Sequence, residues 1–166
     1  GEFAGFQLTR PENGDQGRLY GLELNWQQTL PALPGVGVML NYTLTDSQAD
    51  LPFGIGQTDL PGTSKHSYNA ALNYEAYGYS AQLAYNYRSE YIDALDTADP
   101  KLNTYWDERA TLDFSASYKF SAKLSVFVEA TNLTDSQAIR YQGERSRVFE
   151  HEQFGRAWQM GVRGSF

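Results

Sequence analysis

Hydrophobic and polar residues alternate along most of this chain, and the pattern is clearest towards its C-terminal end. Counting back in twos from Phe166 passes mainly apolar residues, among them Val162, Met160 and Trp158, whereas the intervening positions are small or polar. A β-strand directs successive side chains to opposite faces. The alternation therefore predicts a strand that ends the chain, with one apolar and one polar face.

The same alternation recurs upstream, between clusters of Gly, Pro, Asn and Asp that are typical of turns. The pattern slips at Asn132-Leu133, where we expect a β-bulge within one strand. Together these signals predict about eight strands. Their expected ranges are 2–10, 17–29, 36–46, 64–76, 79–92, 108–120, 124–142 and 148–166.

The expected connections alternate in length. Segments 30–35, 76–79 and 120–123 are short, whereas 47–63 and 93–107 are long. Transmembrane β-barrels have short periplasmic turns and longer extracellular loops, together with aromatic girdles. Tyr, Phe and Trp make up 14% of this chain. The pattern therefore predicts an all-β fold, an antiparallel transmembrane barrel whose short turns and C-terminus are periplasmic.

Composition narrows this interpretation. The mean hydropathy is −0.54 and there is no apolar run of about 18 residues, so no transmembrane helix is expected. A formal net charge of −7 argues against a nucleic-acid partner. The absence of cysteine excludes disulfides and thiolate metal sites. The chain starts without Met or an export signal, so we expect that the front of the gene product is missing.

Several short motifs follow one another in a recognisable order. Asn132-Leu133-Thr134-Asp135, in the penultimate expected strand, resembles the Asn-Leu-Phe/Thr-Asp motif of TonB-dependent receptors. Gly17-x-x-x-Gly21-x-Glu23 resembles a Gly-x-Glu strand of the same family. Further similar segments are Asn41-Tyr42-Thr43, Leu60-Pro61-Gly62, Asn73-Tyr74-Glu75 and Gly155-Arg156.

The resemblance implies a fold and a function. Family members are bacterial outer-membrane barrels of 22 strands with an N-terminal plug domain and a TonB box, and they import siderophores, metal complexes, vitamins or carbohydrates. Residues 1–166 would then be the last strands of one barrel domain, lacking the plug and the TonB box. The implied partners are outer-membrane lipid, the rest of the barrel, the plug, the TonB complex and a small-molecule substrate.

The C-terminal aromatic residues carry a second resemblance. A strand that ends on an aromatic residue, here Phe166, is similar to the assembly signal of outer-membrane barrel proteins. Trp158 lies on the same face of the expected strand. The resemblance implies that these residues are recognised by the barrel-assembly machinery.

The polar face of the expected strands 64–76 and 79–92 is the best candidate for contacts inside the barrel. Two interpretations remain open. The favoured one is a hydrated wall against the plug, in which Arg88 and Glu90 form an ion pair; the other is direct contact with substrate. The candidate residues are Asn69, Asn73, Gln82, Asn86, Arg88 and Glu90.

Other candidate chemistry has a simpler explanation. Asp93, Asp96 and Asp99 in the acidic loop 93–107 suggest Ca²⁺, but the spacing lacks the Gly and closing Glu of an EF-hand loop. A solvated acidic loop is favoured. His151 lies between two glutamates, but neighbouring strand residues point to opposite faces and cannot converge on a metal. His66 is expected to have an interfacial structural role. No metal or cofactor is expected.

Two other classes of function remain as alternatives. A complete eight-stranded barrel with a structural or anchoring role would also close and fill with side chains. An outer-membrane hydrolase would need a nucleophile or activated water beside a base on one face. The two histidines belong to different expected strands, and the period of two places them on opposite faces. Neither can then serve as a base beside the other, so we expect that the protein is not an enzyme.

Overall fold

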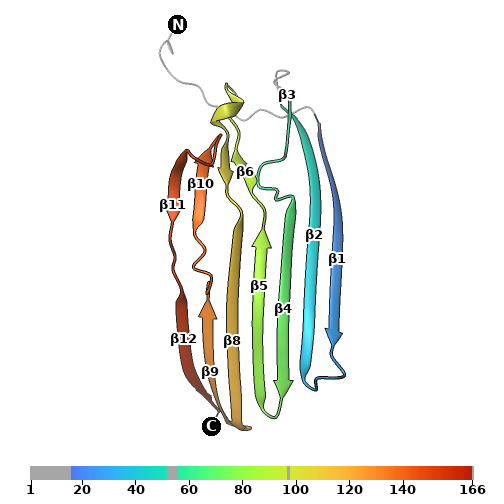
Figure 1. The fold of residues 1–166 in the computed structure, drawn as a ribbon, viewed down its shortest axis with the longest axis vertical. Helices are drawn as coiled ribbons and strands as arrows, with labels where there is room; N and C mark the ends of the chain where they lie inside the picture. The colour runs from blue at the N-terminus through green and yellow to red at the C-terminus, as the bar shows by residue number, and fades with distance from the viewer. Residues whose placement is uncertain (1–15, 52–55, 97, 166) are drawn as a thin grey trace.

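The computed structural model describes residues 16–51, 56–96 and 98–165 and consists of antiparallel β-structure with one short 3-10 helix (Figure 1). The expected strand 2–10 lies outside the described residues. The elements are β1 (Gly17–Thr29), β2 (Val36–Leu51), β3 (Gly56–Thr58), β4 (His66–Ala76), β5 (Tyr79–Arg88), β6 (Tyr91–Ala94), η2 (Pro100–Leu102), β7 (Thr104–Trp106), β8 (Arg109–Ser121), β9 (Leu124–Thr131), β10 (Ala138–Gln142), β11 (Val148–Glu152) and β12 (Ala157–Gly164).

The main sheet has the order β1-β2-β4-β5-β8-β9-β12, with β3 added to the upper end of β2. Its short turns lie together at the lower end of Figure 1, and Gly164 pairs with Leu124 beside one of them. Tyr77 and Gly78 both have positive φ, 54° and 82°. This matches the two-residue type I′ turn, whose twist suits a hairpin. Consecutive long strands therefore run up and down, as expected.

The register confirms that the sheet has one apolar and one polar face. One row runs across five strands through Leu72, Leu83, Phe114, Ala130 and Trp158. The row beside it is polar and runs through Asn73, Gln82, Ser115, Glu129 and Gln159. Neighbouring rows point to opposite faces of a sheet. The alternation seen in each strand is thus aligned between strands.

A second sheet continues the first. Its order, β11-β10-β7-β6, repeats the order β12-β9-β8-β5 of the strands below it. Four interruptions separate the two sheets, at residues 89–90, 107–108, 132–137 and 153–156. We call β6, β7, β10 and β11 the upper sheet. Figure 1 shows it above the left half of the main sheet.

These interruptions correct three predictions. The expected strands 79–92, 124–142 and 148–166 are each divided in two within the described residues. At Asn132 the interruption covers six residues, not the single extra residue of a β-bulge. Asn132 has a positive φ of 54°, which ends the extended backbone, and its side chain then binds neighbouring segments in place of the ladder.

The long connections are more regular than expected. β2 continues to Leu51 and pairs with β3, with Ala49 opposite Thr58, inside the segment 47–63 predicted as a loop. The segment 93–107 contains the end of β6, then η2 and β7. These ordered segments were missed because each is only a few residues long and most of them contain polar residues that obscure the alternation.

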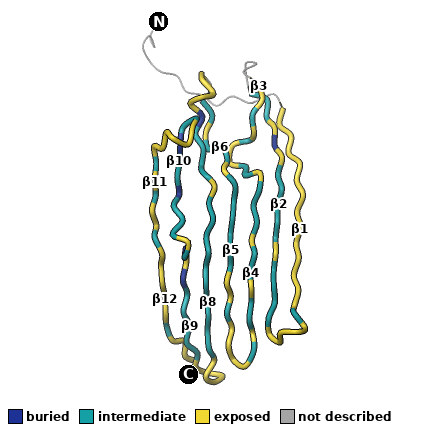
Figure 2. Tube along the Cα trace, viewed as in Figure 1, coloured by how far each residue is buried: buried dark blue, intermediate teal, exposed yellow. Residues whose placement is uncertain are grey.

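Burial differs between the two ends of the molecule. β1 is exposed along its whole length, and Figure 2 shows exposed residues along the lower turns. The buried side chains of the described residues are Ser47, Ile92, Asn103, Ala130, Asn132, Ala138 and Tyr141. Ser47 and Ala130 lie near the upper ends of β2 and β9, and the others lie in the upper sheet, in its connections or at the interruptions. A single layer of strands buries little, so the backbone ladder and the surroundings must stabilise the main sheet. Among the helices described, none has the length and apolar character to span a membrane.

Candidate functional site

Five of the six candidate polar residues lie on the polar face of β4 and β5. Asn73 is opposite Gln82, whose Nε2 donates a hydrogen bond of 2.8 Å to the Asn73 Oδ1. Asn69 is opposite Asn86, and the Asn86 Nδ2 donates to the Asp113 Oδ2 of β8 at 3.1 Å. The strands thus place these amide groups on one face in two rows, which are separated by the pair Ala71 and Ala84, with Asp113 beside Ala84 in β8.

Glu90 does not belong to this face of β5, and the expected ion pair with Arg88 is wrong. β5 ends at Arg88, so Glu90 lies in the interruption before β6. Arg88 donates instead to the Tyr91 hydroxyl at 2.9 Å. Glu90 accepts hydrogen bonds from Arg145 at 2.7 Å and from the Tyr141 hydroxyl at 2.9 Å. The period-2 argument failed here because the strand was taken to continue.

Glu90 is part of a charged cluster in the upper sheet, which we call the rim cluster. Its members are Glu90, Asp93, Tyr105, Trp106, Asp107, Arg140, Tyr141, Arg145, Phe149 and Glu150. Arg145 links Glu90 to Asp107, whose carboxylate is 3.1 Å away. Arg140 pairs with both Asp93 and Glu150.

Aromatic rings complete the rim cluster. The Arg140 guanidinium lies 5.1 Å from the Trp106 ring centroid and 5.0 Å from that of Phe149. These distances fit cation–π interactions. The Trp106 indole donates to Asp93 at 3.1 Å, and Tyr105 stacks on Tyr141 at 5.2 Å. The sequence singled out some of these residues individually but could not show that they meet.

Hydrogen bonding and burial shift the pKa values of Glu90 and Tyr141 in the rim cluster. The hydrogen bond from Arg145 is the main cause that lowers the pKa of Glu90, and the Tyr141 hydroxyl adds to it. Burial, followed by the bond to Glu90, raises the pKa of Tyr141 to about 12. At neutral pH the cluster therefore contains a fixed carboxylate and a neutral phenol. Neither group is poised for acid–base chemistry.

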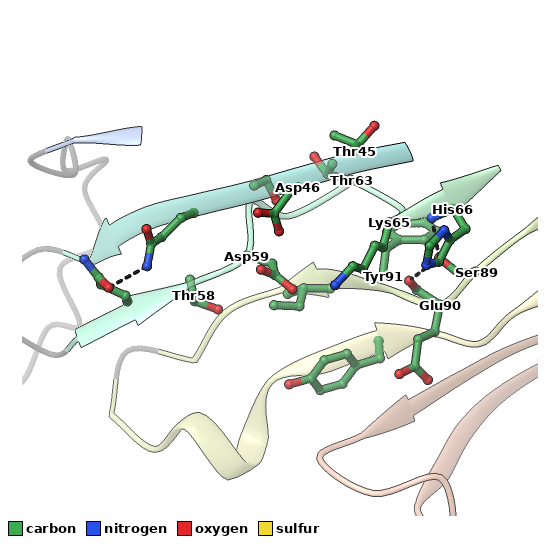
Figure 3. Close-up of a pocket in the computed structure, with 15 residues that line it drawn as sticks. Thr45, Asp46, Thr58, Asp59, Thr63, Lys65, His66, Ser89, Glu90 and Tyr91 are labelled. Atoms are coloured by element: carbon green, nitrogen blue, oxygen red, sulfur yellow. Dashed lines mark hydrogen bonds between the residues drawn. The ribbon is translucent and has the colours of Figure 1, made fainter. Parts of the chain in front are cut away.

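A polar pocket of about 730 Å³ lies between the upper end of β2, β3 and β6 (Figure 3). Its carboxylates, Asp46, Asp59 and Glu90, come from three separate segments, and Lys65 contributes an ammonium group. His66 lines it too and is hydrogen-bonded through Nδ1 to the Tyr42 hydroxyl at 2.9 Å, consistent with a structural role. The pocket can bind a polar solute through several hydrogen bonds.

A second pocket, of about 580 Å³, lies on the polar face where the main sheet meets the interruptions. It is lined by Asn86, Arg88, Arg109 and Thr111, among others, and by the Phe154 ring. Sequence reasoning missed Arg109 and Phe154. Arg109 and Asp113 lie an even number of positions apart in β8, so their side chains share one face. That period of two is the only sequence signal that could have identified Arg109.

The segment Asn132-Leu133-Thr134-Asp135, which we call the Asn132 motif, holds the interruptions together beside this pocket. The buried Asn132 side chain donates from Nδ2 to the carbonyls of Ser136 and Gly155, both at 3.0 Å. Its Oδ1 accepts from the Ser136 N–H at 2.9 Å, and its own N–H donates to Asp113 at 2.8 Å. One residue thus joins β8, β9 and the segment before β12.

The acidic loop uses its carboxylates locally. Asp96 accepts from the N–H groups of Ala98 and Asp99, and Asp99 caps η2 by accepting from the Lys101 N–H. Asp93 is held by Arg140. Within the described residues, no group of three or more His, Cys, Asp or Glu could hold a metal ion. His151 is exposed and contacts Gln137 at 2.6 Å.

Trp158 lies on the apolar face of β12 and is 62% exposed. It is opposite Ala130 of β9. This is the position that the alternation predicts. Phe166, the other expected assembly residue, lies outside the described residues.

Comparison with known proteins gives one match. A family model described as "TonB dependent receptor-like, beta-barrel" matches residues 2–133. The match covers β1 to β9 and ends at Leu133, in the Asn132 motif. Searches of curated proteins and of solved structures found no match.

Proposed function

The chain belongs to the TonB-dependent receptor-like β-barrel family, and from this premise we propose that it forms part of the wall of a receptor that imports a small solute across the bacterial outer membrane. Barrels of this family are characteristic of that membrane. The observation that carries the proposal is the pair of aligned rows in the main sheet, one apolar from Leu72 to Trp158 and one polar from Asn73 to Gln159.

The two faces have different surroundings in this proposal. In a membrane barrel the outward face is apolar and the interior is polar. The exposed apolar side chains of β1 and β12, such as Leu24 (55%) and Met160 (79%), then contact lipid. Asn69, Asn73, Gln82, Asn86 and Arg88 line the lumen, facing the plug or the solute.

The proposal also assigns the two ends of the barrel. The short turns at the lower end are periplasmic, and the upper sheet, with the rim cluster and the polar pocket, is extracellular. An arriving solute would meet the pocket that contains Asp46, Lys65 and Glu90 first. The pocket's hydroxyl, phenol, carboxylate and ammonium groups suit a polar solute such as a siderophore, a metal complex, a vitamin or a carbohydrate.

Further partners follow from the same premise. β1 and β12 are the edges of the main sheet, and open edges are not tolerated in lipid because their N–H and C=O groups would be unsatisfied. Further strands of the receptor complete the barrel. The TonB complex supplies the energy for import, and the assembly machinery recognises Phe166 and Trp158.

Uptake by living cells tests the function. The full-length receptor is produced in a strain that lacks its own copy, and accumulation of labelled iron–siderophore complexes, cobalamin and oligosaccharides is measured with and without active TonB. We expect accumulation of one class only, and only with active TonB. A native mature protein of about 18.7 kDa in the membrane, with no TonB-dependent uptake, would instead support the complete small barrel.

A further inference from the structure

Two arginines face each other on the polar side of the main sheet. Arg88 of β5 and Arg109 of β8 are direct partners in the antiparallel register. Like charges directly opposite each other destabilise a sheet. The other neighbour of Arg88, across β4, is Ser67, which contributes no opposite charge.

Neither arginine has an acidic partner among the described residues. Arg88 donates to the neutral Tyr91 hydroxyl. The Nε of Arg109 is buried without a hydrogen-bond acceptor, and its guanidinium lies 5.7 Å from the Phe154 ring centroid. By contrast, Arg140, Arg145 and Arg163 each lie within ion-pair distance of at least one carboxylate.

The one carboxylate in the same pocket is already engaged. Asp113 accepts from the Asn132 N–H through Oδ1 and from Asn86 through Oδ2. Oδ1 therefore stabilises the junction between β8 and β9, and Oδ2 joins β8 to β5. The pocket of about 580 Å³ is left with two guanidinium groups and an unsatisfied donor.

We propose that this pocket, the Arg88–Arg109 pocket, binds a carboxylate group. A guanidinium presents a planar fork of N–H donors that matches a carboxylate, and an anion between the two arginines would turn their repulsion into attraction. The carboxylate comes from a solute in the lumen or from a segment inside the barrel of the full-length receptor. The inference rests on the proposed function only in that the polar face lines the lumen.

Thermal unfolding of the full-length receptor in detergent micelles tests the site, with succinate as the probe. Succinamide, which has the same carbon skeleton without charge, and NaCl at matched ionic strength are the solute controls. We expect succinate alone to raise the Tm saturably. Arg88→Gln and Arg109→Gln should weaken the apparent Kd for succinate about tenfold or more, the loss of one charge-assisted contact.

Arg163→Gln is the matched control. Arg163 lies on the same polar face as Arg88 and Arg109, but its guanidinium is paired with the Glu129 carboxylate at 3.7 Å. This variant should keep the full succinate response. A second pattern would show that the carboxylate comes from the receptor's own interior. In that case wild type does not respond to succinate, and Arg88→Gln and Arg109→Gln both lower the Tm more than Arg163→Gln does. Arg88→Lys and Arg109→Lys then restore the Tm.

Two results would overturn the proposal. One is a succinate response that is equal in all variants. The other is the absence of any response together with glutamine variants that are as stable as wild type or more so. Because unfolding is measured without transport, a failed uptake experiment leaves this test intact, and a failed titration leaves the uptake result intact.

Discussion

The main sheet and the upper sheet share one strand order but are stabilised in different ways. In the main sheet, side chains of one kind are aligned in rows, as in the apolar row from Leu72 to Trp158. In the upper sheet, strands of three to five residues are joined by the ion pairs and stacked rings of the rim cluster.

The difference follows from the surroundings expected for each sheet. Lipid offers no hydrogen bonds, so a spanning sheet needs a complete backbone ladder and an apolar exterior. Water at the rim removes that constraint, and short strands can be interrupted where side chains replace the ladder. In the proposed orientation, the interruptions at 89–90, 107–108, 132–137 and 153–156 lie at this transition.

Cysteine labelling of intact cells gives the largest expected contrast between the two ends. A cysteine at Ala98, near the upper sheet, should react fully with an impermeant maleimide, whereas one at Ala122, in a lower turn, should not react. The expected difference is nearly all or none. Labelling at Ala122 but not at Ala98 would reverse the orientation.

A charge on the apolar face should be the most destabilising substitution. Leu83→Arg should cost about 2–4 kcal/mol near mid-bilayer, and Phe114 and Val126 should behave similarly. The matched control is Ser115→Arg, because Ser115 lies in the adjacent polar row and should tolerate the charge at much lower cost. The measurement is a denaturant titration in lipid vesicles. Equal losses at the two positions would mean that the faces are assigned wrongly.

Asn132→Ala should act on the junction between the sheets. The side chain is buried and its loss leaves the carbonyls of Ser136 and Gly155 unsatisfied. We expect a loss of about 1–3 kcal/mol in the same titration. Asn132→Asp keeps the oxygen acceptor but turns a second oxygen and a negative charge towards the two carbonyls, so its loss should be at least as large. A neutral Asn132→Ala would contradict the structural role of the motif.

The smallest effect is expected from the rim cluster and depends on pH. Because the folded state lowers the pKa of Glu90, its contribution is present above the ordinary carboxyl pKa, about 4.3, and is lost as the pH falls through the folded value. Tyr141 has a raised pKa of about 12, so its contribution is complete below pH 10 or so and is lost as the pH rises towards 12.

Arg145→Gln should therefore lower stability at neutral pH and make no difference in acid. The loss should stay below about 1 kcal/mol, because the Arg145 and Glu90 side chains are 55% and 46% exposed and water screens the pair. The measurement is the Tm of variant and wild type from pH 3 to 9. Arg147→Gln is the control, since Arg147 forms no ion pair with the described residues. A pH-independent difference would exclude the ion pair as its cause.

The sequence predicted correctly those parts of the site that depend only on which face of a strand each residue occupies. Asn69, Asn73, Gln82, Asn86 and Arg88 lie on one face as expected, because side-chain direction in a strand repeats every two residues. Glu90 was placed wrongly, because its strand ends two residues earlier. Arg109 and Phe154 were not found, since nothing near them in the chain shows that they line one pocket.

By itself the sequence determined the all-β class, most strand boundaries of the main sheet and its two chemically distinct faces. Those features arise from local alternation and from turn residues such as Tyr77-Gly78. Only the tertiary structure decided which charges meet. Arg140 and Asp93 are 47 residues apart, and Arg145 and Glu90 are 55 apart. Their pairing depends on register and on where each strand is interrupted, and those depend on contacts between strands that no short segment encodes.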